Sequence, residues 1–297
     1  MKKFVLAILA ILILLAGLTL ILYPTLSDYY NRVHQSGAIV DYAEKISGFD
    51  DDTFQRMWDE AVLYNKQLYD LTRGIETPES EKLDYYDVLN VTSSGMMSYI
   101  DIPCINCHLP LCHGTDEGTL QSNAGHIETS SLPVGGENTH CVISGHTGLP
   151  SAKLFTYLDA VHEGDIFTLS TLGVVLTYEV DQVLVVLPHE ADALGIVPGM
   201  DYCTLVTCTP YGVNSHRLLV RGHRIETPET VEEEVKAKVE EAQKETSEPF
   251  YIALAVAIGL LLLIIILVIV RSIAHRKAKK RAEEQASSGE NETPQQN

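Results

Sequence analysis

Residues 202–224 read YCTLVTCTPYGVNSHRLLVRGHR, and this stretch contains the features on which the prediction of the fold depends. A strand-like run ends at Thr207 and Cys208, the segment TPYGVNS is typical of a turn, and a second strand-like run starts at His216 and Arg217. The pattern therefore predicts a cysteine at the end of one strand, beside an arginine at the start of the neighbouring strand.

A cysteine and an arginine in this relation suit nucleophilic chemistry. Nearby cations lower the pKa of a thiol and so increase its thiolate fraction. Arg217 stays charged and can also donate hydrogen bonds to a developing oxyanion. The simpler alternative is that Cys208 is a small apolar residue of a strand, with Arg217 at the surface.

A second candidate group lies in residues 138–150, NTHCVISGHTGLP. The strand-like run THCVIS leads into Gly145-His146-Thr147-Gly148, so His146 is expected in a tight turn at a strand end. Such a histidine can act as a general acid or base for a thiol that the fold brings near it. The alternative is a turn histidine with no partner, and the other histidines are expected mostly at the surface or in turns.

The region from residue 99 to 225 is rich in short β-type runs separated by Gly, Pro and Asn, which predicts a mainly β barrel or sandwich. The expected strands cover residues 98–102, 105–109, 139–144, 165–171, 174–187, 202–208 and 216–222. Short helical pieces are expected near 116–122 and 151–160. A longer helix is expected at 50–73, after a mixed connector at 24–48, and a charged, solvated helical stalk at 226–249.

Two uncharged apolar runs, at residues 4–23 and 250–270, are each long enough to cross a bilayer. A cleaved signal peptide is the alternative for the first run, but no clear cleavage site follows it. Lysines precede the first run and a basic cluster follows the second, so both termini are expected in the cytoplasm and residues 24–249 outside the cell.

The charge distribution excludes one class of partner. Eight of the 21 Lys and Arg and four of the 40 Asp and Glu lie at the two ends, so the central part carries a net charge near −23. An acidic domain repels phosphate backbones, and nucleic-acid binding is therefore not expected.

The cysteines allow other hypotheses. Cys104 and Cys107 have the spacing of a zinc or redox pair, but no second pair follows, and in a strand their side chains would point to opposite faces. No metal site is therefore predicted. Disulfide bonds among the cysteines other than Cys208 are possible in an exterior domain, without an assignable pairing.

These segments carry a resemblance to a known family. TLVTC at 204–208 matches the T-L-x-T-C signature of sortases, Arg217 stands where the family's arginine falls, and SGHTGLPSAKLF at 144–155 is similar to the segment with the family's histidine. YIDIPCIN at 99–106, the stretch at 109–140 and the apolar run at 250–270 resemble the pilus-building class C branch.

The resemblance implies an eight-stranded sortase barrel with short helices and a cysteine transpeptidase activity that needs no cofactor. Cys208 would attack the threonine carbonyl of an LPXTG-like sorting signal, and His146 would protonate the leaving amine and later deprotonate the incoming one. Arg217 would stabilise the oxyanion, and the family supports Thr207, together with Thr204, as a contributor to the oxyanion or substrate site. Class C members usually join the product to a lysine of a pilin subunit.

One feature of class C is missing. Its members commonly carry an Asp-Pro-aromatic lid motif, whereas this chain has Glu76-Thr77-Pro78-Glu79 in the matching region. A sortase that anchors surface proteins to cell-wall peptide amines is the alternative within the family, and a non-enzymatic, membrane-tethered thiol or binding module is the alternative outside it. The expected parts are an N-terminal span at 1–23, a helical and lid-like region at 24–97, the catalytic barrel at 98–225, the stalk at 226–249, a second span at 250–270 and a cytoplasmic tail at 271–297.

Overall fold

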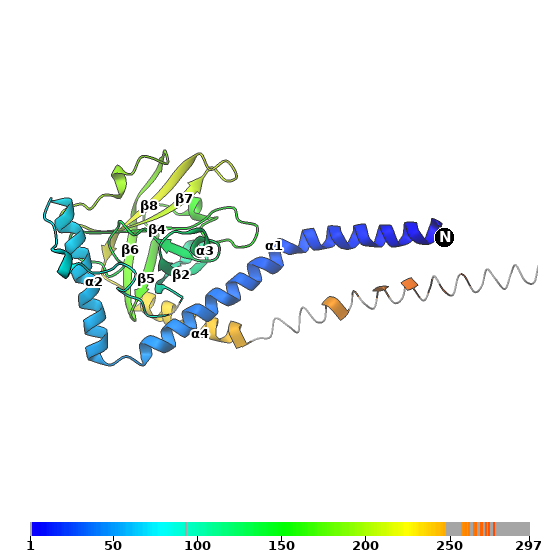
Figure 1. The fold of residues 1–297 in the computed structure, drawn as a ribbon, viewed down its shortest axis with the longest axis horizontal. Helices are drawn as coiled ribbons and strands as arrows, with labels where there is room; N and C mark the ends of the chain where they lie inside the picture. The colour runs from blue at the N-terminus through cyan, green and yellow to red at the C-terminus, as the bar shows by residue number, and fades with distance from the viewer. Residues whose placement is uncertain are drawn as a thin grey trace, which may run out of the picture. The chain divides into compact units, whose positions relative to one another are not determined.

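The structure is a computed structural model that describes residues 2–92, 94–247 and scattered positions between 257 and 276. The chain divides into two units, Met1–Thr246 and Ser247–Asn297, and the barrel lies in the first. Eight strands close into this barrel in the order β1-β2-β3-β4-β7-β8-β6-β5 (Figure 1). The strands are β1 (Met96–Ile102), β2 (Cys107–His113), β3 (Ala124–His126), β4 (Thr139–Ser144), β5 (Ile166–Thr171), β6 (Val174–Val186), β7 (Asp201–Thr209) and β8 (His216–Ile225).

The predicted barrel-type, mainly β fold is confirmed, and the seven expected strands correspond to β1, β2 and β4 to β8. The boundaries differ most at β2, because the strand expected at 105–109 shares only residues 107–109 with it. The sequence reading missed β3. It also placed a helical piece at 151–160, where the structure has only a short 3-10 turn, Leu158–Ala160. The piece expected near 116–122 is present as α3 (Glu117–Leu120).

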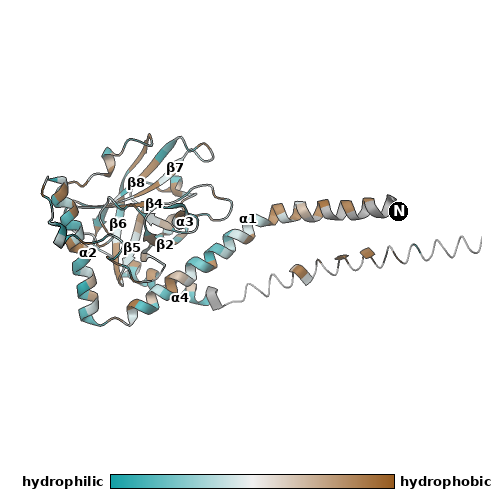
Figure 2. Ribbon diagram, in the orientation of Figure 1, coloured by the Kyte–Doolittle hydropathy of each residue, from teal (hydrophilic) through white to brown (hydrophobic). Residues whose placement is uncertain are grey.

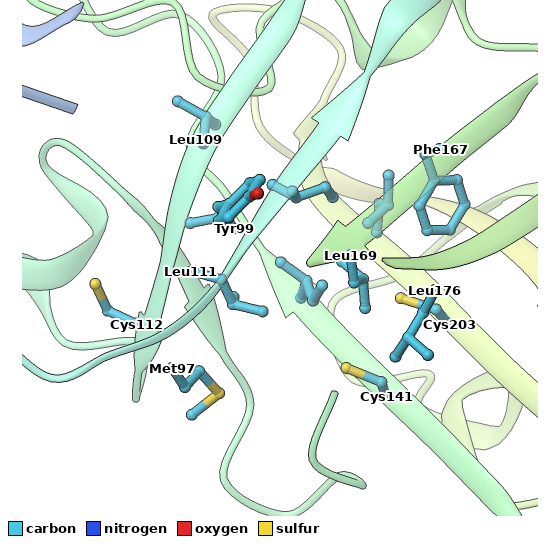
Figure 3. Close-up of a cluster of buried hydrophobic side chains, with 14 of the residues drawn as sticks. Met97, Tyr99, Leu109, Leu111, Cys112, Cys141, Phe167, Leu169, Leu176 and Cys203 are labelled. Carbon is cyan, nitrogen blue, oxygen red and sulfur yellow. The ribbon is translucent and has the colours of Figure 1, made fainter. Parts of the chain in front are cut away.

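Successive side chains of each strand point alternately into the barrel and away from it. The barrel interior is apolar because the inward-facing side chains are mostly apolar. Figure 3 shows part of this core, with Phe167 and Leu169 from β5 and Leu176 from β6. Cys141 of β4 and Cys203 of β7 lie side by side in it, since they are register partners in neighbouring parallel strands. Removing so many apolar side chains from water is the main stabilising contribution to a barrel of this kind.

Helix α1 (Lys2–Ser47) corrects the expectation of a mixed connector at 24–48, because it continues past Pro24 to Ser47. After Pro24 it is mostly polar (Figure 2), but Ile39 and Tyr42 are fully buried against the barrel. The Tyr42 hydroxyl donates a hydrogen bond to the Met97 carbonyl at 2.9 Å and accepts one from the Leu172 amide at 2.8 Å. These two bonds attach α1 to both β1 and the β5–β6 turn.

Helix α2 (Asp51–Thr72) confirms the helix predicted at 50–73. Asp50 is its N-cap, and its side chain accepts a hydrogen bond from the Thr53 amide, as expected for a carboxylate at a helix start. Asn65, which is buried, binds both backbone groups of Leu132 and so fixes α2 to the loop before β4.

Helix α4 (Glu229–Ser247) corrects the prediction of a solvated stalk. Val231, Val235 and Ala242 are buried, and the Lys238 ammonium group lies 2.6 Å from Asp101 of β1. One face of the charged helix therefore packs on the barrel, while its acidic side chains occupy the other face.

Among the residues that the structure describes, no helix combines the length and the apolar character needed to cross a membrane. The span expected at 250–270 lies largely outside the described residues.

Candidate active site

The hairpin of β7 and β8 brings Cys208 and Arg217 together, as the sequence predicts. The two strands are antiparallel, and Cys208 is the register partner of Arg217 at the end of the ladder next to the turn. Directly opposite residues of an antiparallel pair have their side chains on the same face and about 5 Å apart at Cβ. Both side chains are half-buried, so a substrate can reach the thiol.

On the outer face of the sheet, a row of side chains along β7 ends at Cys208. Along β7 the side chains alternate, so Thr204, Val206 and Cys208 point to this face while Cys203 and Leu205 point to the core. Val206 packs there with Val142 of β4 and Leu219 of β8 in a small apolar cluster that is separate from the core. Cys208 therefore stands at the end of an apolar strip of the outer face.

The Arg217 guanidinium is held by the turn between β7 and β8. Its Nη1 donates hydrogen bonds to the carbonyls of Asn214 at 3.3 Å and His216 at 3.0 Å. These bonds use one nitrogen of the fork. The planar group has five donors in total, so the remaining ones can serve an oxyanion or a substrate carbonyl.

The loop after β4 carries His146 and is fixed to β7 one residue away from it. The Gly145 amide donates to the Val206 carbonyl at 3.0 Å, and the Thr207 hydroxyl donates to the Gly145 carbonyl at 2.7 Å. Because Val206 and Thr207 immediately precede Cys208, His146 lies at the same end of the sheet as the thiol. The imidazole is half-buried.

Gly145 is required by the packing of this loop. A Cβ atom at position 145 would lie 2.5 Å from the Phe155 ring, which is fully buried against the backbone there. The Phe155 amide in turn donates to the His146 carbonyl at 3.0 Å. The loop thus folds back on itself over Gly145, and this contact explains why a glycine precedes the histidine.

The two threonines of TLVTC have structural partners. Besides the bond of Thr207 to Gly145, the Thr204 hydroxyl lies 2.7 Å from Nε2 of His140, and both side chains are almost fully buried. Neither hydroxyl points into open space beside Cys208. A contribution of Thr204 and Thr207 to an oxyanion or substrate site therefore stays a prediction, since both hydroxyls are used in hydrogen bonds within the fold.

His140 is a residue that the sequence reading missed, because it expected the remaining histidines mostly at the surface or in turns. His113, His126 and His140 are instead buried. Nothing in the run NTHCVIS distinguishes a buried, hydrogen-bonded ring from an exposed one. No sequence signal therefore pointed to the hydrogen bonds that His140 makes in the folded chain.

The other cysteines are less suited to attack a peptide. Cys107, Cys112, Cys141 and Cys203 are buried, and burial raises the pKa of Cys112 to about 12 and that of Cys203 well above its usual value. Cys104 is exposed, in a 3-10 turn (Pro103–Ile105) and not in a strand as expected, and burial together with the Asp165 carboxylate raises its pKa. Cys208 is thus the accessible thiol with a cationic neighbour.

The contacts of the lid-like region between α2 and β1 are with parts of the chain other than the candidate site. The Gln67 side chain donates to the Glu81 carbonyl at 2.8 Å, and the buried Tyr85 hydroxyl lies 3.0 Å from Nδ1 of His126 and accepts a bond from the Gly114 amide. These contacts hold the segment against α2, β3 and the loop after β2.

A hollow of about 310 Å³ lies between α2 and residues 134–139. Its lining includes Trp58, Tyr69 and Thr139. Thr139 is the partner of Asp201, at the opposite end of β7 from Cys208, so this hollow is not part of the candidate site.

Comparisons of the sequence and of the structure with known proteins both find sortases. The family model described as Sortase domain matches residues 100–225. The structure of sortase C1 from Streptococcus agalactiae is 48% identical, covers 64% of this chain and 99% of its own, and superposes with a TM-score of 0.60. The corresponding values are 42%, 64%, 97% and 0.56 for sortase C of Streptococcus pneumoniae, and 43%, 64%, 99% and 0.57 for sortase C of Clostridium perfringens solved with the C-terminal cell wall sorting motif. The chain spans less than two thirds of the length of the curated relatives it matches, for instance 45% of a sortase A from S. agalactiae at 31% identity.

Proposed function

Because the chain belongs to the sortase family, we propose that it is a cysteine transpeptidase that cleaves an LPXTG-like sorting signal and joins it to an amine. The observation that carries the proposal is the register of Cys208 with Arg217 at the turn end of β7 and β8, with the loop of His146 fixed to the two residues before the thiol.

In the first half-reaction, Cys208 Sγ attacks the carbonyl carbon of the signal's threonine. The bond from that carbon to the next residue's nitrogen breaks, and His146 supplies the proton that the leaving amine takes. Arg217 donates hydrogen bonds to the oxygen that becomes negative on the way to the thioacyl-enzyme.

In the second half-reaction, an incoming amine transfers a proton to His146 and attacks the thioester carbon. The Cys208 thiolate leaves, and an amide bond is formed. The chain's own residues thus supply the nucleophile, the acid and base, and the oxyanion donors, and no metal or organic cofactor is required.

The acceptor that we propose is a lysine side chain of a pilin subunit. Several solved structures that are similar to this chain are sortases C, and one of them is described with pilin substrate specificity and another with a cell wall sorting motif. Anchoring of surface proteins to cell-wall peptide amines uses the same chemistry and differs in the acceptor alone.

We also propose that the enzyme is held in the cell membrane by spans at residues 4–23 and 250–270, with the barrel outside and both termini in the cytoplasm. Sortases are typically membrane-associated surface enzymes. The described residues in the first part of α1 are mostly apolar (Figure 2), and large side chains such as Leu14, Leu20 and Ile21 are exposed there. Exposed apolar side chains in such a row are stable in a lipid environment.

A peptide assay tests the proposed chemistry. Purified protein is incubated with a fluorogenic LPXTG-type peptide and either a pilin domain or a cell-wall peptide as amine donor. We expect cleavage, a thioacyl-enzyme detectable by mass spectrometry, and a faster reaction with the pilin lysine. Cys208→Ala should abolish all three signals while the circular dichroism spectrum stays unchanged.

Each alternative has its own outcome in this assay. A faster reaction with the cell-wall peptide would assign the enzyme to surface anchoring. Cleavage that persists in Cys208→Ala, or a wild-type protein that forms no acyl-enzyme with any peptide while Cys208 reacts with iodoacetamide no faster than the other thiols, would support the non-enzymatic module instead.

A further inference from the structure

The loop between β6 and β7, residues 187–200, lies over the outer face that leads to Cys208. Ala193 and Leu194 from this loop pack against the apolar cluster of Val142, Val206 and Leu219. Val206 is two residues before Cys208 and points to the same face. The loop therefore covers part of the outer face close to the end of β7 that carries Cys208.

A chain of hydrogen bonds through the buried His140 side chain holds this loop to the sheet beneath it. Nδ1 of His140 lies 2.9 Å from the Gly195 carbonyl, and Nε2 of the same ring lies 2.7 Å from the Thr204 hydroxyl. Gly195 directly follows Leu194, the residue that packs on the cluster. His140 and Thr204 are each 1% exposed, so the bond between their side chains is shielded from water, whereas Gly195 is exposed and its bond to His140 is only partly buried.

The direction of each bond in this chain is fixed. A carbonyl oxygen can only accept, so Nδ1 of His140 carries the proton and donates it to Gly195. A neutral ring then accepts at Nε2, and the Thr204 hydroxyl must be the donor. Burial lowers the pKa of His140, so the ring stays neutral around pH 7 and this arrangement is maintained.

We propose that Thr204 and His140 are positioning residues that fix the 187–200 loop as a wall of the substrate groove beside Cys208. The inference rests on the proposed function, since the groove is defined by its peptide substrate. Thr204, the first threonine of TLVTC, would thus act on the 187–200 loop through the His140 side chain. Thr207, the second threonine, donates directly to the loop of His146.

A purely space-filling role for Thr204 makes a different prediction. Valine has the same shape as threonine, so it would fill the same volume on the outer face. It cannot donate to Nε2 of His140, which would then be a buried acceptor without a partner. The ring would be free to turn or to change tautomer, and the Gly195 carbonyl would lose its fixed donor.

The experiment compares Thr204→Val, Thr204→Ser and Thr168→Val in the full-length enzyme. Thr168 lies in β5, is 1% exposed, and its hydroxyl has no hydrogen-bond partner among the described residues, so its valine variant is a matched buried control. The readouts are KM and kcat for an LPXTG-type peptide, the rate of alkylation of Cys208 by iodoacetamide, and hydrogen–deuterium exchange of the amides in residues 187–200.

We expect Thr204→Val to raise KM about three- to tenfold, the size expected for loss of one neutral hydrogen bond, and to increase exchange in the 187–200 loop. The alkylation rate should stay at the wild-type value, because a small reagent does not need the groove. Thr204→Ser should restore both KM and exchange, and Thr168→Val should resemble the wild type.

Two results would overturn the proposal. One is a Thr204→Val enzyme whose KM and loop exchange equal those of Thr168→Val, and the other is a loss of alkylation rate in parallel with KM, which indicates general damage. If the wild-type enzyme turns over no sorting peptide, the proposed function fails, and the exchange measurement still decides whether Thr204 holds the loop.

Discussion

Arg217 occupies a position in which its planar group is already oriented before a substrate arrives. One nitrogen binds the carbonyls of Asn214 and His216, and Arg217 is the register partner of Cys208. Lysine keeps the charge but is a point donor without the planar fork. We therefore expect Arg217→Lys to lower kcat/KM for a sorting peptide about 100-fold, the size found when an oxyanion donor is removed.

The control for this variant is Arg56→Lys, at an exposed position of α2 where the guanidinium pairs with Glu60 on the same helix. It should retain full activity. An Arg217→Lys enzyme within about threefold of the wild type would mean that charge alone is sufficient, which contradicts an oxyanion role based on geometry.

The residues of the candidate site differ in how far the sequence could predict them. Cys208 and Arg217 could be placed together because a short turn between two strands determines which residues face each other. His146 could be named as a candidate, but its position depends on β4 lying beside β7, which is a pairing of segments distant in sequence. His140 was missed because its role comes from two hydrogen bonds made in the folded state, to Thr204 and Gly195, and neither has a local pattern.

At the scale of elements, α4 is held to the barrel by a pair of charges as well as by apolar contacts. The Lys238 ammonium group lies 2.6 Å from Asp101, whose side chain is only 3% exposed. Removing one partner leaves the carboxylate buried without a counter-charge. Since Lys238 is itself 26% exposed, we expect Lys238→Met to lower the free energy of unfolding by about 2 kcal/mol, less than for a fully buried pair. Urea unfolding followed by circular dichroism measures the change.

The same helix offers a matched control. Lys236 pairs with Glu232 at the exposed face of α4, so Lys236→Met should change the free energy of unfolding by less than about 0.5 kcal/mol. Adding Asp101→Asn to Lys238→Met should recover part of the loss, because the unpaired charge is then gone. Equal effects of the two lysine variants would show that the contact of Lys238 with Asp101 does not stabilise the docked helix.

The elements that the sequence reading missed have physical reasons in common. Strand β3 has three residues, Ala124–His126, with a glycine at its centre, so it carries almost no β-type pattern. Residues 24–48 were expected to form a mixed connector, yet α1 continues through Pro24 to Ser47. In α4 the signal was present as Val231, Val235 and Ala242 at helical spacing, but the surrounding charges dominated the composition and hid the buried stripe.

At the scale of the whole molecule, α1 connects the N-terminal segment to the loop of His146. Asp28 accepts a hydrogen bond from the Lys153 amide at 3.0 Å, and the Asn31 side chain donates to the Ser151 carbonyl at 2.8 Å. Both partners lie in the loop that starts at Gly145 and folds back through Phe155. The helix that we propose to emerge from the membrane therefore also supports the loop of His146.

The proposed topology predicts which thiol a membrane-impermeant reagent can reach on intact cells. In a Cys208→Ala background, Cys104 is the exposed cysteine, while the other four are buried. If the barrel lies outside the cell, a charged maleimide should label Cys104 equally well before and after the membrane is permeabilised. The labelling is done near pH 8, because burial and the Asp165 carboxylate raise the pKa of this thiol and slow its reaction at neutral pH.

Cys104→Ser in the same background should remove the signal, which identifies the labelled residue. Labelling that appears only after permeabilisation would put the barrel on the cytoplasmic side, where sorting signals on exported proteins could not reach it.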